Sequence, residues 1–247
     1  STDVMEVMGI SGLETVLFDE QPAPGGQIYR AIEIVAGERP QDLSILGPEY
    51  RRGSGLVEAF RKCGATYCPG TSVWQLTPDL QLGTVDAHGA RMVPARHVLL
   101  ATGALERPVP FPGWTLAGVM TAGAAQGLLK SSGMLPDVPV VFYGSGPLLY
   151  QVAWQLAEAG VPVSAILDTG IRANYAAAAP HLPAALAAGD YLAKGLRLLN
   201  GIRHHRIPII RGVGDFHALG EGRVAEVSYR QGGSTHHRDA GLVLVHE

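Results

Sequence analysis

A glycine-rich stretch near the middle of the chain carries the residue pattern with the clearest chemical meaning. Residues Val140 to Leu149 read VVFYGSGPLL, an apolar run followed by two glycines and a helix-forming segment. One glycine permits a tight turn, and the other lets the backbone approach a pyrophosphate. A helix that begins directly after the turn adds free N–H groups and a positive dipole end, both of which attract an anion. We therefore expect a dinucleotide-binding turn, with a purely structural turn as the alternative, formed by Gly144, Ser145, Gly146, Pro147 and Leu148.

An acidic residue at a suitable spacing supports this interpretation. Asp168 follows the glycines by about 20 residues, at the end of the next apolar run, where a carboxylate can accept hydrogen bonds from ribose hydroxyls. We expect Asp168 to be exposed, which argues against a 2′-phosphate, whereas Arg172 nearby keeps NADP open as a ligand. The pattern lacks its third glycine, because Leu149 stands in that place.

A second candidate nucleotide site lies near the start of the chain. A short apolar strand ends in Asp19 and Glu20, and either carboxylate could hold an adenosine ribose. Gly25, Gly26 and Gln27 follow, and paired glycines let a backbone come close to a flat ligand. A polar strand end with an ordinary turn is equally compatible with this spacing.

A third segment reads HVLLA at residues 97–101, which is typical of a parallel strand covered on both faces. It ends in Ala101, Thr102 and Gly103. These small residues fit either a close approach of the backbone to a ligand or the ordinary end of a strand.

The cysteines and histidines carry weaker signals. Cys63 and Cys68 have the spacing of a redox pair, but they fall between a predicted helix and a predicted strand, so we interpret them as structural thiols. The pairs at 204–205 and 236–237 lack further ligands at metal spacing apart from Asp239, so we expect solvated loop histidines and no metal. We assign no side chain as a catalytic acid or base.

Around these segments, apolar periodicity predicts an α/β fold. Strands are expected at 14–18, 72–75, 81–85, 91–93, 97–101, 139–143, 163–167, 207–211, 224–230 and 242–245. Helices are expected at 54–62, 121–129 with Thr121 as the cap, 148–159 and 182–199. The proline-rich connector at 108–113 divides the chain into a first domain, 1–112, and a second domain, 113–247.

Composition excludes several classes of function. The chain has 247 residues, of which 47% are hydrophobic and 17% charged, as in globular proteins rather than disordered ones. A net charge of −3 without a basic run argues against nucleic acid. Glycines and prolines interrupt the apolar stretch 138–167, so we expect no transmembrane segment. Two cysteines and no visible leader favour a cytoplasmic location.

Four segments in order resemble one family: DEQPAPGGQIYR from Asp19, LLATGALERPVPFPGW from Leu99, VMTAGAAQ from Val119 and GSGPLL from Gly144. The family is that of the FAD-containing subunits of opine oxidase, hydrogen cyanide synthase and dye-linked proline or hydroxyproline dehydrogenase, within the two-dinucleotide-binding flavoproteins.

The resemblance implies two Rossmann-type units. Asp19 or Glu20 would hold the FAD ribose, residues 25–27 would line the flavin, and residues 101–103 would mark the crossing to the second unit. Gly144, Gly146 and Asp168 would bind NAD(P) or another adenine nucleotide.

The resemblance has two departures. Family members begin with a GxGxxG loop that grips the FAD pyrophosphate, whereas residues 1–12 read STDVMEVMGISG, so we expect an incomplete first unit. The family also continues beyond the position of Glu247 into the rest of its FAD domain and a cysteine-rich iron–sulfur segment, so we expect either a fragment or residues omitted from the sequence.

The expected function is that of an FAD-dependent oxidoreductase subunit that uses a small-molecule electron donor or acceptor and pairs with a separate substrate-oxidising chain. A non-catalytic nucleotide-binding or assembly subunit and a thioredoxin reductase-like NAD(P)H flavoprotein are the alternatives.

Overall fold

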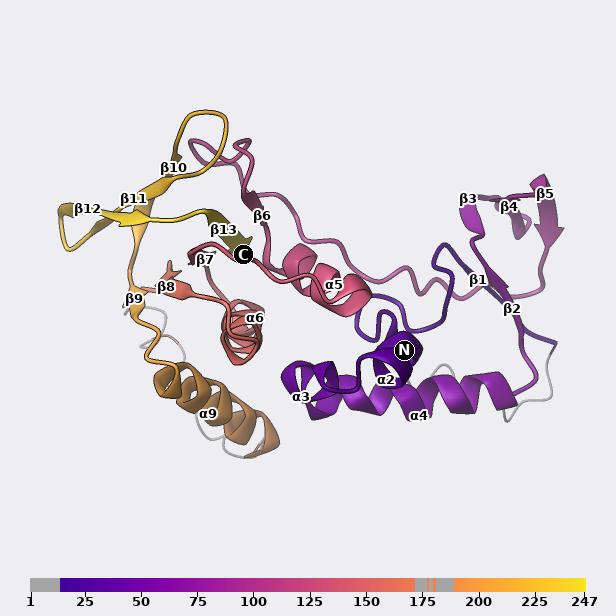
Figure 1. The fold of residues 1–247 in the computed structure, drawn as a ribbon. Helices are drawn as coiled ribbons and strands as arrows, with labels where there is room; N and C mark the ends of the chain where they lie inside the picture. The colour runs from indigo at the N-terminus through magenta and orange to yellow at the C-terminus, as the bar shows by residue number, and fades with distance from the viewer. Residues whose placement is uncertain (1–13, 172–176, 178–179, 181–188) are drawn as a thin grey trace. The chain divides into compact units, whose positions relative to one another are not determined.

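The computed structural model describes residues 14–171, 177, 180 and 189–247, which form a mixed α/β protein, as the sequence predicts (Figure 1). The chain divides into two compact units, Ser1–Ala104 and Leu105–Glu247.

The first unit contains a parallel strand pair connected by helices. β1 (Val16–Asp19) pairs with β2 (Thr66–Pro69). Because parallel strands need a crossover, the chain between them folds into helices, which are α2 (Ile32–Glu38), α3 (Asp42–Leu46) and α4 (Pro48–Lys62). α4 begins earlier than the sequence pattern predicts, because Pro48 has a backbone suited to a first helical turn. α2, α3 and β2 were not predicted, since their apolar runs are short.

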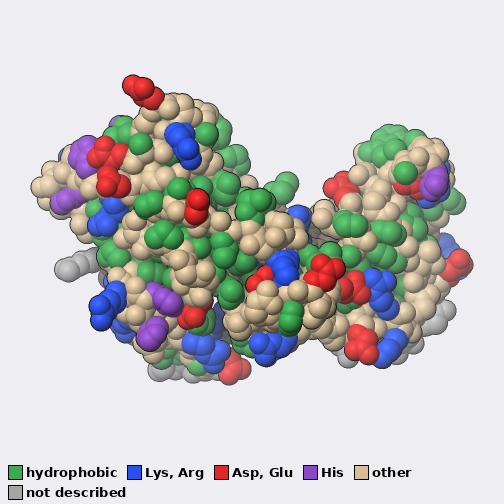
Figure 2. Space-filling view, viewed as in Figure 1, with side chains coloured by type: hydrophobic (Ala, Val, Ile, Leu, Met, Phe, Trp, Pro, Cys, Tyr) green, Lys and Arg blue, Asp and Glu red, His purple; other side chains and the backbone are tan. Residues whose placement is uncertain are grey.

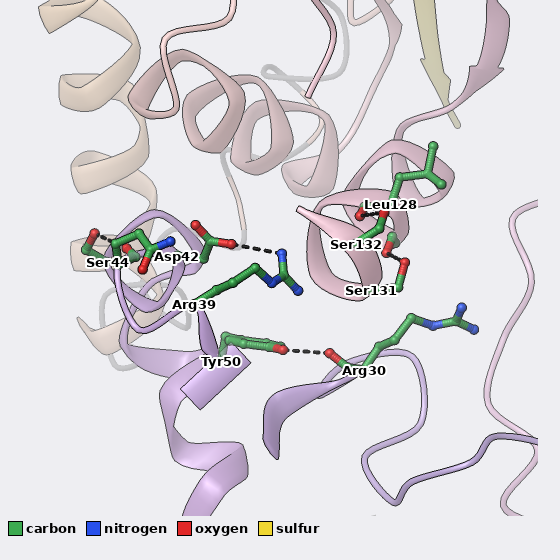
Figure 3. Close-up of polar contacts among 10 residues, drawn as sticks. Arg30, Arg39, Asp42, Ser44, Tyr50, Leu128, Ser131 and Ser132 are labelled. Carbon is green, nitrogen blue, oxygen red and sulfur yellow. Dashed lines mark hydrogen bonds and ion pairs between the residues drawn. The ribbon is translucent and has the colours of Figure 1, made fainter. Parts of the chain in front are cut away.

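Polar contacts fix the segment between β1 and α4 (Figure 3). The Tyr50 hydroxyl donates a hydrogen bond of 2.6 Å to the backbone oxygen of Arg30, and Arg39 forms an ion pair of 2.9 Å with Asp42. Burial raises the pKa of Tyr50 to about 12, so its proton is retained at neutral pH. The end of the turn that contains Gly25 and Gly26 is therefore tied to α4.

A small antiparallel sheet follows, formed by the three strands that the sequence predicts at 72–75, 81–85 and 91–93. It consists of β3 (Ser72–Leu76), β4 (Gln81–Asp86) and β5 (Gly89–Pro94). Apolar side chains lie at the surface of this sheet (Figure 2). Trp74 of β3 is 57% exposed.

The predicted strand at residues 97–101 is wrong. This segment has no regular secondary structure, and Leu99 and Leu100 are 60% and 69% exposed. A buried parallel strand needs hydrogen-bonded neighbours on both sides. In the part of the chain that the structure describes, β1 and β2 pair only with each other, so the apolar run has no place in a sheet.

The second unit is built on a five-stranded parallel sheet in the order β6-β13-β7-β8-β9. Its strands are β6 (Val119–Thr121), β7 (Val140–Gly144), β8 (Val163–Asp168), β9 (Ile209–Arg211) and β13 (Leu242–His246). The chain runs outward from β7 through β8 to β9, whereas β13 and β6 lie on the other side of β7. This reversal is a topological switch point, where α/β sheets bind ligands at the carboxyl ends of their strands.

Among the described residues, three helices accompany this sheet: α5 (Ala122–Ser132), α6 (Pro147–Glu158) and α9 (Gly189–His204). The Thr121 hydroxyl accepts a hydrogen bond from the Ala124 amide, which confirms the predicted cap of α5. The strand, helix and strand predicted at 139–143, 148–159 and 163–167 are confirmed as β7, α6 and β8, which form a βαβ unit. α9 covers the end of the helix expected at 182–199, of which residues 182–188 lie outside the described part.

An antiparallel layer of β10 (Gly214–Leu219), β11 (Glu226–Gln231) and β12 (Ser234–Asp239) completes the unit. The loop assignment is wrong for three of these histidines. His236 and His237 lie on β12, paired with Tyr229 and Ser228 of β11, and His204 is the last residue of α9, whereas His205 lies in the turn that follows. Their polar character suits an exposed strand as well as it suits a loop.

Candidate functional site

The predicted glycine turn lies at the carboxyl end of β7, with φ +131° at Gly144 and +90° at Gly146. A Cβ on Gly144 would lie 1.8 Å from the backbone oxygen of His246, so the close approach of β13 requires a glycine here. A Cβ on Gly146 would lie 3.6 Å from its nearest neighbours, which are ring atoms of His246. The space beside Gly146 is therefore open enough for a ligand phosphate, whereas Gly144 serves the packing of the strands.

The first turn of α6 follows directly. α6 has Pro147 in its first turn and no side-chain cap, so the turn's remaining N–H groups at Leu148 and Leu149 have no capping side chain. The Ser145 amide donates instead to the backbone oxygen of His246 at 2.8 Å. Leu149, in the place of the third glycine, is fully buried. This arrangement can bind an anion through the helix start.

Asp168 ends β8 beside the turn, in register with Gly144 of β7. The expectation that it is exposed is wrong, because Asp168 is only 5% exposed. One carboxylate oxygen accepts from the Gly170 amide at 2.7 Å, and the other accepts from the Tyr150 hydroxyl of α6. Arg211 of β9 lies 3.8 Å from the same carboxylate. A carboxylate has further lone pairs, so ribose hydroxyls could still reach it.

Two charged residues at this sheet edge escaped sequence reasoning. Arg211 is the arginine that the structure places next to Asp168, whereas the predicted Arg172 lies outside the described residues. Glu106 binds His246 across 140 positions of sequence, with 2.6 Å between Oε1 and Nδ1. No local pattern signals such a pair, since only the sheet brings the two residues together.

In the first unit, the structure distinguishes the two carboxylates at the end of β1. Asp19 accepts hydrogen bonds from the Gln21 amide at 2.9 Å and from the Tyr67 hydroxyl at 3.2 Å. Burial and the neighbouring carboxylate raise the pKa of Tyr67, so this hydroxyl keeps its proton. Glu20 is exposed and is therefore the more accessible carboxylate.

The paired glycines also differ from each other. Gly25 has φ +136°, and a Cβ there would lie 2.4 Å from the backbone oxygen of Tyr29. Gly26 has φ +55° with open space around it, and Gln27 is exposed. Gly25 is thus required by the turn itself, while Gly26 leaves room for a ligand.

Among the described residues, the structure does not bring the other predicted residues together into a binding site. Residues 101–103 are exposed and outside regular structure, and Gly103 has φ +75°. Cys63 ends α4 and Cys68 lies in β2, both as free thiols. Within residues 14–171 and 189–247 there is no group of three or more histidine, cysteine or acidic residues that could hold a metal ion. No described helix is both long and apolar enough to cross a membrane.

Comparisons with known proteins place these features in context. No protein-family model matches the chain. The chain is 42% identical over 245 residues to an opine oxidase subunit of Agrobacterium tumefaciens (strain Ach5), which covers 96% of the chain and 48% of that protein. It is 36% identical over 230 residues to hydrogen cyanide synthase subunit HcnB of Pseudomonas aeruginosa, covering 88% of the chain and 46% of that protein. The chain thus spans about half the length of these relatives.

The fold has a match among solved structures. Thioredoxin reductase of T. acidophilum superposes with a TM-score of 0.61 and 16% identity, covering 99% of this chain and 72% of that one. This likeness shows that the two proteins share a fold. The resemblance indicated by the residues is confirmed: the chain is related to the opine oxidase subunit and to hydrogen cyanide synthase subunit HcnB, and it has the Rossmann-type α/β fold.

Proposed function

We propose that this protein is an FAD-dependent oxidoreductase subunit that passes electrons between a flavin and a second acceptor or nucleotide, within a heteromeric amino-acid or opine-type dehydrogenase. The observation that carries the proposal is the relation, over 96% of the chain, to a protein named as one subunit of an opine oxidase. The named subunits imply a separate substrate-oxidising partner and a small-molecule electron donor or acceptor.

The second unit fits an adenine dinucleotide such as NAD(P). The helix start at Leu148 and Leu149 can receive the pyrophosphate, and the open side of Gly146 gives it room. Asp168 would accept ribose hydroxyls. Arg211 is half exposed beside that carboxylate and could meet a 2′-phosphate, which keeps both NAD and NADP open.

The first unit supplies part of a site for FAD. Glu20 is the exposed carboxylate at the end of β1, and Gly26 offers open backbone next to the exposed Gln27. When bound, the flavin would supply hydride and electron transfer itself. The protein's residues then bind and orient the nucleotides, and no side chain in these two sites is assigned as a catalytic acid or base.

The alternative is a non-catalytic nucleotide-binding or assembly subunit. It is favoured by the exposed, irregular state of residues 99–103, which the flavin proposal needs near the cofactor. A thioredoxin reductase-like activity has only the common fold in its support, because both cysteines lie in the first unit.

A visible spectrum of the purified full-length protein tests the proposal. We expect flavin absorption that bleaches when NADH is added without oxygen and returns when a dye is added. A colourless protein that still binds an adenine nucleotide would instead support the non-catalytic alternative. Fractionation of cells tests the cytoplasmic location, which stays a prediction.

A further inference from the structure

We infer that His246, held in place by Glu106, contacts the phosphate of the nucleotide at the glycine turn, and that binding adds a proton to the imidazole. This inference rests on the proposed nucleotide site of the second unit. It assigns a role in nucleotide binding to His246 and Glu106, which lie outside the glycine turn.

The position of the ring supports this role. His246 is the last residue of β13 and is in register with Gly144 of β7. Its ring atoms Cδ2 and Nε2 lie 3.6 Å from the position of a Cβ on Gly146. The ring edge that carries Nε2 is therefore turned towards the open side of the glycine turn, where we place the pyrophosphate.

Glu106 fixes the orientation of this ring. Its Oε1 lies 2.6 Å from Nδ1 of His246, and its Oε2 accepts a hydrogen bond of 2.7 Å from the Gly123 amide in the first turn of α5. A Cβ on Gly123 would lie 2.3 Å from Oε2, so a glycine is needed for this contact. The carboxylate is thus held at both oxygens and cannot turn away without losing one partner.

The partners of the carboxylate decide what the free ring nitrogen can do. An ionised carboxylate only accepts hydrogen bonds, so Nδ1 must donate to Glu106. In a neutral ring, Nε2 then carries a lone pair, which repels a phosphate oxygen. In the protonated ring, Nε2 carries a hydrogen and donates to that oxygen. Contact with a phosphate therefore requires the protonated ring, and a ring that is neutral before binding must take up one proton from solvent on Nε2.

The charged groups around the ring fit a single proton uptake. Glu106 faces Nδ1, and Glu247 follows the end of β13, where its Oε1 is 3.4 Å from the Thr169 hydroxyl. Asp168 of β8 is already partnered by Arg211 of β9. The first turns of α5 and α6 contain no acidic residue. The positive ring would thus lie between the Glu106 carboxylate and an anionic ligand.

Calorimetric titration with ADP, the part common to the dinucleotides, tests the inference on flavin-saturated full-length protein. His246→Gln and Glu106→Gln are compared with the parent protein between about pH 6 and 8.5, the range in which histidines change charge. The chain offers a matched control pair, His237 and Glu226, joined at 2.7 Å through the same atoms on the surface of β12 and β11.

We expect the parent protein to bind ADP more tightly at about pH 6 than at about pH 8.5, and to take up protons on binding. The proton uptake is measured from the difference in binding enthalpy between buffers that have different ionisation enthalpies. His246→Gln should bind about tenfold more weakly near pH 6, the usual loss for a hydrogen bond to a charged group, with little pH dependence. Glu106→Gln should shift the pH dependence, and His237→Gln should change neither quantity.

Equal affinity and equal proton uptake in parent and His246→Gln would overturn the inference while leaving the nucleotide site intact. No ADP binding by the parent would overturn both the inference and the second unit's proposed role. An equal loss in His246→Gln at every pH would overturn the proton uptake, because a neutral contact does not depend on pH.

Discussion

At the scale of single residues, a substitution at Gly146 is the most direct test of the proposed dinucleotide site. A branched side chain would fill the open side of the turn where the pyrophosphate must lie. We expect Gly146→Val to weaken binding of an adenine dinucleotide by several kcal/mol, about the cost of forcing a group into occupied space. Calorimetric titration of folded parent and variant measures this loss.

A control variant is needed to distinguish backbone strain in Gly146→Val from a side chain that blocks the ligand. Gly232, in the turn between β11 and β12, also has a positive φ, of +58°, with open space around it. Gly232→Val should carry a comparable backbone cost and leave nucleotide affinity unchanged. An unchanged affinity in Gly146→Val would remove the pyrophosphate from this turn.

Variants of the two carboxylates at the end of β1 are expected to have different effects, one on FAD binding and the other on stability. Asp19 is engaged by the Tyr67 hydroxyl and the Gln21 amide, whereas Glu20 is exposed. We expect Glu20→Gln to raise the dissociation constant for FAD by about tenfold with little change in stability, and Asp19→Asn to lower stability instead. Flavin fluorescence and denaturant unfolding measure the two effects, and the reverse result would assign the ribose to Asp19.

The cysteines are predicted to be dispensable for electron transfer. Both are free thiols, at the end of α4 and within β2. Replacing Cys63 and Cys68 by serine should leave NADH-linked dye reduction within about a few-fold of the parent, since neither thiol takes part in the proposed route. Loss of activity with the flavin retained would support a disulfide reductase.

At the scale of elements, a carboxylate joins α2 to α4. Arg61 donates two hydrogen bonds of 2.7 Å to the oxygens of Glu33, and these lower the pKa of Glu33 from its ordinary value of 4.5. The folded state thus prefers the charged carboxylate. The stabilisation is present above pH 4.5 and is lost as the pH falls through the lowered pKa.

We expect Glu33→Gln to lower the free energy of unfolding by less than about 1 kcal/mol at pH 7, because the pair is partly exposed and screened by solvent. The difference should shrink as the pH falls below 4.5 through the lowered pKa of Glu33, and unfolding of parent and variant should coincide once this carboxylate is protonated. Glu58, which pairs with Lys62 within α4, provides a control that joins no second element. A difference that persists in acid would mean that the pair acts through packing rather than charge.

At the scale of the whole molecule, the described residues provide two candidate nucleotide sites and no separate domain for a substrate carboxylate. The small sheet β3–β5 is too short for one. We therefore expect the full-length protein with FAD to reduce a dye from NADH and to show no turnover with proline, hydroxyproline, glycine or opines until a partner chain is added. Oxidation of any of these substrates by the isolated protein would contradict the heteromer proposal.

The sequence by itself determined the elements whose signals are local. A strand, a glycine turn and a helix at 140–158 were predictable because the apolar period, the glycine pair and the helix start all lie within one short continuous segment. The Thr121 cap and the β3–β5 sheet follow the same logic. The family resemblance was likewise readable, since it depends on residue identity alone.

Only the tertiary structure decided what the candidate residues contact. Asp168 is contacted by Tyr150 of α6 and lies beside Arg211 of β9. Glu106 contacts His246, which is 140 positions away in the sequence. The apolar run at 97–101 reads as a buried strand, yet it has no sheet neighbour among the described residues. Burial and hydrogen bonding depend on which strands become neighbours, and this pairing is a long-range choice that a local pattern does not contain.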